Sequence, residues 1–203
     1  PDLAPPNVRV VNQSSTSLLV TWDPLPAGHT RGVLAGYRVW YRALKNSDDE
    51  RAAVVPPGRG DVIIRDLRVF TVYVVQVEAF TGAGTGPRSE PYRASTDEDL
   101  PVSAPFNITV EPVNSTVAVI KWSGVPRQHL NGFFGGYHVS YRRLTEYVSC
   151  DMSVHTSCTQ VVLGPIEPGV EYKVQVSALT GRGDGPRSEA VMFSTKGVMT
   201  IRD

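Results

Sequence analysis

The residues that could perform acid–base or metal chemistry are few, and their spacing does not assemble a catalytic site. The chain contains no G-x-S-x-G, H-E-x-x-H, Walker or dinucleotide-binding motif. Its histidines do not stand at metal-ligand or catalytic-triad spacing; they are His29, His129, His138 and His155. We therefore predict that this chain is not an enzyme and has no cofactor and no metal site.

Two cysteines, Cys150 and Cys158, are the other reactive side chains. An even pair close in sequence is typical of a local disulfide in a secreted chain, and we predict that pairing. The alternative is two free thiols. A metal site would need more ligands than the nearby His155 supplies.

Three glycosylation sequons point to the extracellular compartment. They begin at Asn12, Asn107 and Asn114, and none has proline at its middle position. Together with the cysteine pair, they predict an N-glycosylated chain on the extracellular side of the plasma membrane.

Charge and hydropathy exclude two classes of partner. Twenty basic and twenty acidic residues give a formal net charge of zero, which argues against nucleic acid as a partner, because nucleic acid binding needs a clustered positive field. No run of 18 apolar residues occurs, so we expect no membrane insertion by this chain.

The chain repeats itself with an offset of about 100 residues, which indicates two copies of one domain. The aromatic and turn residues Trp22, Tyr37, Tyr41, Tyr73 and 86–90 recur as Trp122, Tyr137, Tyr141, Tyr172 and 185–189. An acidic, proline-bounded stretch separates the copies. We predict domains at residues 1–98 and 103–196, a short linker at 99–102 and a C-terminal tail at 197–203.

Each copy is predicted to be all-β, because short β-branched or aromatic runs alternate with Pro, Gly, Asn and Asp. The expected strands cover 8–10, 17–22, 36–42, 61–64 and 73–80, and in the second copy 107–110, 117–122, 136–142, 160–163 and 172–179. Alternation places Tyr37 and Val39 on an inner face, and Trp40 and Glu78 on an outer, solvated face.

These residues resemble the fibronectin type III domain, twice over. The resemblance lies in a proline-rich start, the tryptophan, a G-Y-x-V-x-Y-R run, the late tyrosine and a G-x-G-x-G-P-x-S turn. It implies two seven-stranded antiparallel immunoglobulin-like sandwiches in tandem, with Trp22 and Trp122 buried. It also implies that Tyr73 and Tyr172 form tyrosine corners, whose hydroxyl groups bond to backbone upstream.

The resemblance also draws attention to candidate protein-binding residues. Arg182-Gly183-Asp184 lies in the turn that carries the integrin-binding tripeptide in fibronectin itself. The alternative is an ordinary turn, because the first copy has the same glycines around Ala83 and Thr85. Trp40, flanked by arginines on the outer face, is either a contact residue or is covered by those long side chains.

Similar tandems occur in neural immunoglobulin-superfamily adhesion molecules and in receptor tyrosine phosphatases. We therefore expect an extracellular spacer and protein-interaction module with homophilic or heterophilic cell-surface ligands, part of a larger single-pass or lipid-anchored protein. That longer protein could carry an intracellular phosphatase or kinase domain. An integrin-binding matrix segment is the alternative. A cytokine-receptor module is not supported, because the four-cysteine set and the W-S-x-W-S sequence are missing.

Overall fold

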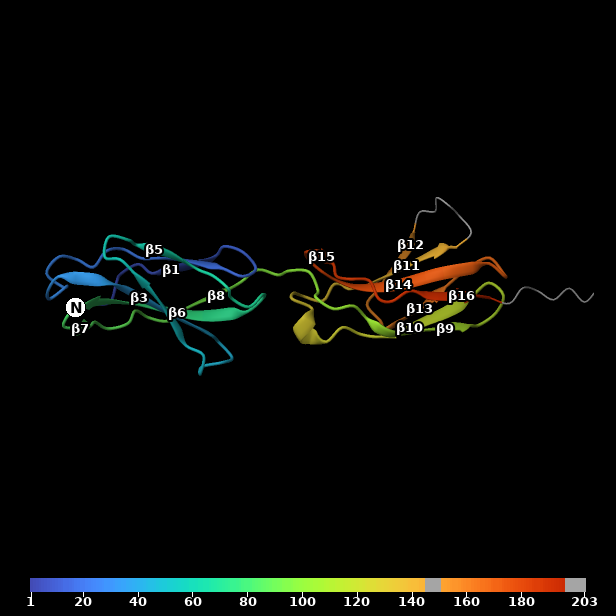
Figure 1. Ribbon diagram of the computed structural model, residues 1–203, viewed down its shortest axis with the longest axis horizontal. Coiled ribbons are helices and arrows are strands. Elements are labelled where there is room, and N and C mark those ends of the chain that lie inside the picture. Colours follow the sequence, from blue (N-terminus) through green and yellow to red (C-terminus); the bar gives the residue numbers. More distant parts are fainter. Residues whose placement is uncertain (145–150, 196–203) are drawn as a thin grey trace, which may run out of the picture. The chain divides into compact units, whose positions relative to one another are not determined.

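The computed structural model describes residues 1–144 and 151–195. It divides into two compact units, Pro1–Asp97 and Glu98–Asp203. Each unit consists of two antiparallel sheets packed face to face, as the ribbon in Figure 1 shows. The prediction of an all-β tandem of sandwiches is confirmed.

The first unit has one sheet of three strands and one of five. The smaller sheet has the order β1-β2-β5, from Arg9–Asn12, Leu18–Thr21 and Asp61–Ile64. The larger sheet has the order β4-β3-β6-β7, with β8 also paired to β6; its strands are Arg51–Val55, Leu34–Ala43, Val72–Thr81, Gly84–Thr85 and Tyr92–Ser95.

The second unit repeats this topology. Its smaller sheet has the order β13-β10-β9, from Gln160–Leu163, Ala118–Ser123 and Phe106–Pro112. Its larger sheet has the order β12-β11-β14-β15, with β16 paired to β14; the strands are Met152–Thr156, Gly136–Arg143, Glu171–Thr180, Gly183–Asp184 and Val191–Ser194. In the described residues, helix is limited to the 3-10 turn η1, Arg127–His129.

Within residues 1–144 and 151–195, each unit has seven strands when its last strand is counted as one interrupted strand. β7 and β8 both pair with β6, and the residues between them include Gly86 and Pro87. Proline has no N–H to give to the ladder, so regular pairing stops there. The predicted strands do not include β4 and β12, which lie at the edge of their sheets and have few buried residues.

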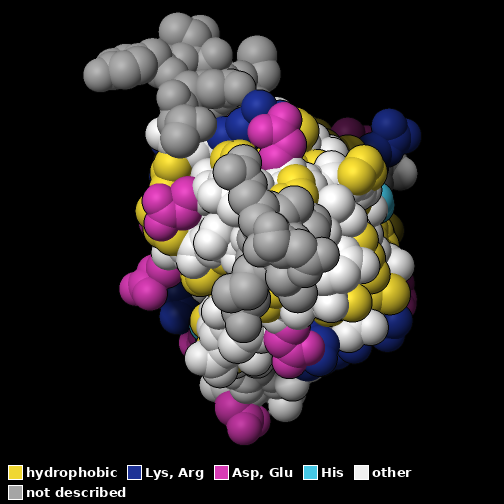
Figure 2. Space-filling view, turned by 90° about the vertical axis from the view of Figure 1, so that its right-hand side faces the viewer, with side chains coloured by type: hydrophobic (Ala, Val, Ile, Leu, Met, Phe, Trp, Pro, Cys, Tyr) yellow, Lys and Arg dark blue, Asp and Glu magenta, His cyan; other side chains and the backbone are white. Residues whose placement is uncertain are grey.

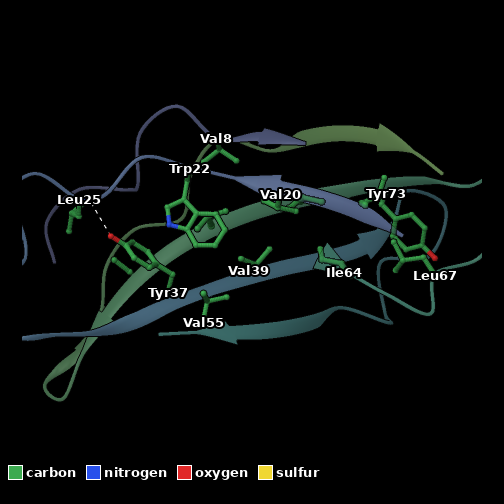
Figure 3. Close-up of a cluster of buried hydrophobic side chains, with 14 residues drawn as sticks. Val8, Val20, Trp22, Leu25, Tyr37, Val39, Val55, Ile64, Leu67 and Tyr73 are labelled. Carbon is green, nitrogen blue, oxygen red and sulfur yellow. Dashed lines mark hydrogen bonds between the residues drawn. The ribbon is translucent and has the colours of Figure 1, made fainter. Parts of the chain in front are cut away.

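The core of the first unit is built around one tryptophan. Trp22 is 4% exposed, and its ring lies 5.3 Å from that of Tyr37. Figure 3 shows these two rings toward one end of the core and Tyr73 with Leu67 toward the other. The backbone N–H of Leu25 donates to the Tyr37 hydroxyl at 3.0 Å, so this buried polar group is satisfied.

The second core uses the equivalent residues. Trp122 is 6% exposed and lies 5.4 Å from the ring of Tyr137. Tyr172 is buried and stacks on Phe193 at 5.7 Å. The predicted burial of both tryptophans is confirmed.

Both tyrosine corners are present. The backbone N–H of Arg68 donates to the Tyr73 hydroxyl at 2.8 Å, and that of Glu167 donates to the Tyr172 hydroxyl at 3.0 Å. The bonds fix the loop that enters β6 or β14 against the core.

Truncation of either core tryptophan is expected to unfold its own unit. Trp22→Ala or Trp122→Ala should lower the free energy of unfolding by about 3–5 kcal/mol, because a large cavity replaces the ring. Urea unfolding followed by near-ultraviolet circular dichroism measures the loss. Trp40→Ala, on the outer face, is the matched control and should cost less. A core variant as stable as the native chain would contradict this account of the core.

Candidate protein-interaction sites

The tripeptide Arg182-Gly183-Asp184 spans a turn and the start of a strand. Arg182 is exposed in the turn after β14, and its backbone N–H approaches the Thr180 hydroxyl at 3.4 Å. Gly183 has a φ of +132°, which favours glycine at this position. Asp184 belongs to β15 and pairs with Leu179 of β14.

The carboxylate of Asp184 already has a partner on the sheet. Its Oδ1 lies 2.8 Å from Nδ1 of His138 on β11. The His138 ring in turn lies 5.5 Å from that of His155 on β12, and His155 Nε2 donates to the Gly135 carbonyl at 2.8 Å. The Arg182 side chain is therefore exposed in a turn, whereas the Asp184 carboxylate contacts a histidine on the sheet.

The second such tripeptide, Arg59-Gly60-Asp61, has a structural explanation. The Gly60 carbonyl accepts the backbone N–H of Trp22 at 2.9 Å, and a Cβ at Gly60 would lie 2.8 Å from the Trp22 carbonyl oxygen. Arg59 and Asp61 pair with each other at 3.4 Å. Glycine is required here by the approach of two backbones.

Trp40 lies half-buried beneath two arginines on the outer face of the first unit. The Arg88 guanidinium carbon is 4.1 Å from the centre of the Trp40 ring, and that of Arg38 is 5.8 Å away. Such stacking provides cation–π attraction and covers the ring. The ring is therefore packed within its own sheet.

Glu78 corrects the expectation that this outer face is fully solvated. It is only 6% exposed, with Oε1 2.8 Å from Arg38 Nη1 and Oε2 3.9 Å from Arg88 Nε. Arg88 also pairs with Glu50 at 3.1 Å. These long side chains bury the carboxylate while neutralising it.

The outer face of the second unit is hollowed at the matching place. Ser140 stands where the first unit has Trp40, and a hollow of about 200 Å³ opens there. Polar side chains line it: Ser140, Arg142, Asp151, Lys173, Gln175 and Arg187. The motifs in the sequence do not predict this site, although the 100-residue offset that pairs Trp40 with Ser140 is a usable signal for it.

The three sequon asparagines lie at exposed positions. The Asn12 amide, at the end of β1, donates to Asp97 at 2.6 Å. Asn107 lies in β9 with a φ of 52°, and Asn114 accepts the backbone N–H of Thr116 at 2.9 Å in a turn. Their glycosylation stays a prediction.

The predicted disulfide is not shown by the structure. Cys150 lies outside the described residues, whereas Cys158 is exposed between β12 and β13. The backbone N–H of Cys158 donates to the Thr156 hydroxyl at 3.1 Å.

Charges of both signs lie side by side on the face seen in Figure 2.

Over residues 1–144 and 151–195, no three His, Cys, Asp or Glu side chains are grouped so as to hold a metal ion. In the same ranges no helix has the length and apolar character needed to cross a membrane.

Comparison with known proteins agrees with this architecture. The family model for the fibronectin type III domain matches residues 3–95 and 103–194. The chain is 37% identical over 97% of its length to the mouse protein "Cell adhesion molecule DSCAML1". It is 30% identical over its full length to the Drosophila melanogaster "Tyrosine-protein phosphatase Lar", and 31% identical over 96% of its length to the chicken "Neuronal cell adhesion molecule". It spans only 10% of the first two relatives and 16% of the third.

The buried cluster around Glu78 generates a stability prediction. Glu78→Gln should lower the free energy of unfolding of the first unit by about 1–3 kcal/mol, because it removes the buried negative charge that pairs with the Arg38 and Arg88 guanidinium groups. Thermal unfolding measures the change. Glu90→Gln, at an exposed position, is the control and should change the stability by less than about 0.5 kcal/mol. Equal effects of the two substitutions would show that the cluster contributes nothing.

Proposed function

The chain belongs to the fibronectin type III family, and from that premise we propose that it is an extracellular spacer and protein-interaction module of a cell-surface adhesion molecule or receptor. The observation that carries the proposal is similarity along almost the whole tandem to segments of adhesion molecules and of a tyrosine-protein phosphatase. In this role the two domains are non-catalytic.

The packing of each domain indicates which surfaces are used. Both interiors are filled by side chains, including a tryptophan and two tyrosines in each. A partner therefore contacts outer sheet faces or loop tips. The first outer face is covered by its own arginines over Trp40, whereas the second is open around Ser140.

Several features support an extracellular setting. The three sequon asparagines are exposed, and an exposed Cys158 is separated from Cys150 by seven residues. We propose that all three asparagines carry glycans and that the cysteines form a disulfide. We also propose that the domains belong to a longer membrane-attached protein, because the chain spans only a small part of relatives whose names describe cell adhesion molecules and a tyrosine-protein phosphatase.

The integrin-binding alternative has no support in the comparisons. It rests on Arg182-Gly183-Asp184 alone, and the Asp184 carboxylate is paired with His138. Integrin recognition requires that carboxylate to complete a metal site.

A binding experiment tests the proposed function. The glycosylated 203-residue chain, displayed as a tetramer, should bind saturably to a subset of neuronal or epithelial cells, and trypsin treatment of the cells should abolish binding. A heat-denatured tetramer is the control. Binding no stronger than that control on every cell type tested would overturn the proposal.

Cell binding should not depend on the tripeptide. Asp184→Glu shifts the carboxylate by one methylene, and chelation by EDTA removes divalent ions; we expect neither to reduce cell attachment. Asp61→Glu is the matched control. A sharp loss with both Asp184→Glu and EDTA, but not with Asp61→Glu, would restore the integrin alternative.

The disulfide has a direct test. Mass spectrometry of the secreted chain without reduction should find a peptide linking Cys150 to Cys158, with a mass two hydrogens below that of its reduced form. Cys158→Ser should abolish it. Recovery of two alkylated thiols from the native chain would show that the cysteines are free.

A further inference from the structure

We propose that the hollow on the outer face of the second domain binds a carboxylate side chain of a protein partner. We call this hollow the cationic socket and define it by Ser140, Arg142, Asp151, Lys173, Gln175 and Arg187. The inference rests on the proposed function, and it adds the chemistry that a partner has to present.

The outer faces of the two domains share the same strand register and the same side-chain hydrogen bond, but they differ in the residue at one position. In both, an outer-face glutamine donates to the carbonyl of the serine that follows the G-P-R turn, at 3.0 Å from Gln76 and at 3.0 Å from Gln175. Trp40 is the register partner of Gln76, and Ser140 is the register partner of Gln175. A tryptophan therefore fills the position in the first domain that a serine leaves open in the second.

The last, interrupted strand of each domain supplies an arginine at the equivalent place on the outer face. Arg88 covers the Trp40 ring, whereas its counterpart Arg187 lines the socket. Without an aromatic ring beneath it, the Arg187 guanidinium is available to polar groups. Asp151 is one such group, 2.9 Å from Arg187 Nη1. This pair shows that a carboxylate can be held at this position.

Two positive charges of the socket lie directly opposite each other, and this arrangement lowers the stability of the sheet. Arg142 on β11 is the direct register partner of Lys173 on β14, whereas in the first domain Arg42 faces Val74. Like charges directly opposite on neighbouring strands destabilise a sheet. Within the described part of the chain, neither Arg142 nor Lys173 has an ion-pair partner. A bound anion would relieve this repulsion.

The extent of positive charge favours an acidic side chain over a sulfated polysaccharide. The three cations and Asp151 leave two positive charges in excess. The next outer positions along the two strands are Ser140 on β11 and Gln175 on β14, both uncharged, so the positive charge does not continue along the face. A long polyanion gains affinity from an extended basic surface. A carboxylate needs only the local one, with Arg and Lys as donors.

Nuclear magnetic resonance of the isotope-labelled 203-residue chain tests the inference, with acetylated and amidated tetraglutamate as the probe. At low salt, the probe should shift the resonances of Ser140, Lys173 and Gln175 saturably. Arg142→Gln and Lys173→Val should each weaken binding by about threefold to fivefold, the range of partly exposed ion pairs. Arg42→Gln, the matched change in the first domain, should have no effect.

Two further variants separate the site from general charge. Ser140→Trp copies the first domain, fills the socket and should abolish the saturable shifts. Lys173→Val should raise the melting temperature of the second domain without any ligand, because it removes the opposed cation. Binding unchanged by Ser140→Trp, or a melting temperature lowered by Lys173→Val, would overturn the inference.

A sulfated heparin octasaccharide is the second probe, and it tests whether the socket binds a glycan instead of a carboxylate. Saturable binding of the octasaccharide to the same residues, with no binding of tetraglutamate, would assign the socket to a glycan and overturn the inference. If tetraglutamate fails while the tetramer still binds cells, only the socket inference fails. If tetraglutamate binds the socket but the tetramer binds no cell, the proposed function fails instead.

Discussion

The packing of one tryptophan between two sheets is the constraint on which each domain depends. Trp22 and Trp122 each contact a tyrosine from the facing sheet, and inward residues of the central strands beside them, such as Val39 and Val139, are completely buried. Because side chains alternate along a strand, every inward residue is committed to this core. Sequence change that alters binding is therefore confined to the outer faces and the loops.

The outer faces show how far two copies of one frame can diverge. In the first domain, Trp40 and Glu78 are covered by arginines that both neutralise and stack. In the second, serines replace both residues, and the remaining cations surround a hollow. The first arrangement satisfies its charges internally. The second leaves adjacent positive charges, which the carboxylate of the proposed partner would neutralise.

The two tripeptides show why a short motif depends on its backbone setting. Gly60 is fixed by close approach to the Trp22 carbonyl, and Gly183 by its positive φ. Asp184 lies in a paired strand, where its carboxylate reaches His138. The glycines serve the fold, so the tripeptides arise where the fold already requires glycine.

The sequence by itself determined the repeat, the sandwich class, the buried tryptophans and the tyrosine corners. The repeat follows from the offset of about 100 residues and the sandwich class from the short strand signals, whereas the buried tryptophans and the tyrosine corners are what the resemblance to the fibronectin type III domain implied. Each corner is local, because Tyr73 reaches only as far back as Arg68. Tertiary structure decided the burial of Glu78 and the formation of the cationic socket. Each of these features brings together side chains from three separate segments of the chain. In the socket they are Arg142, Lys173 and Arg187. Alternation tells which face a side chain occupies, but only strand order and register tell which side chains share it.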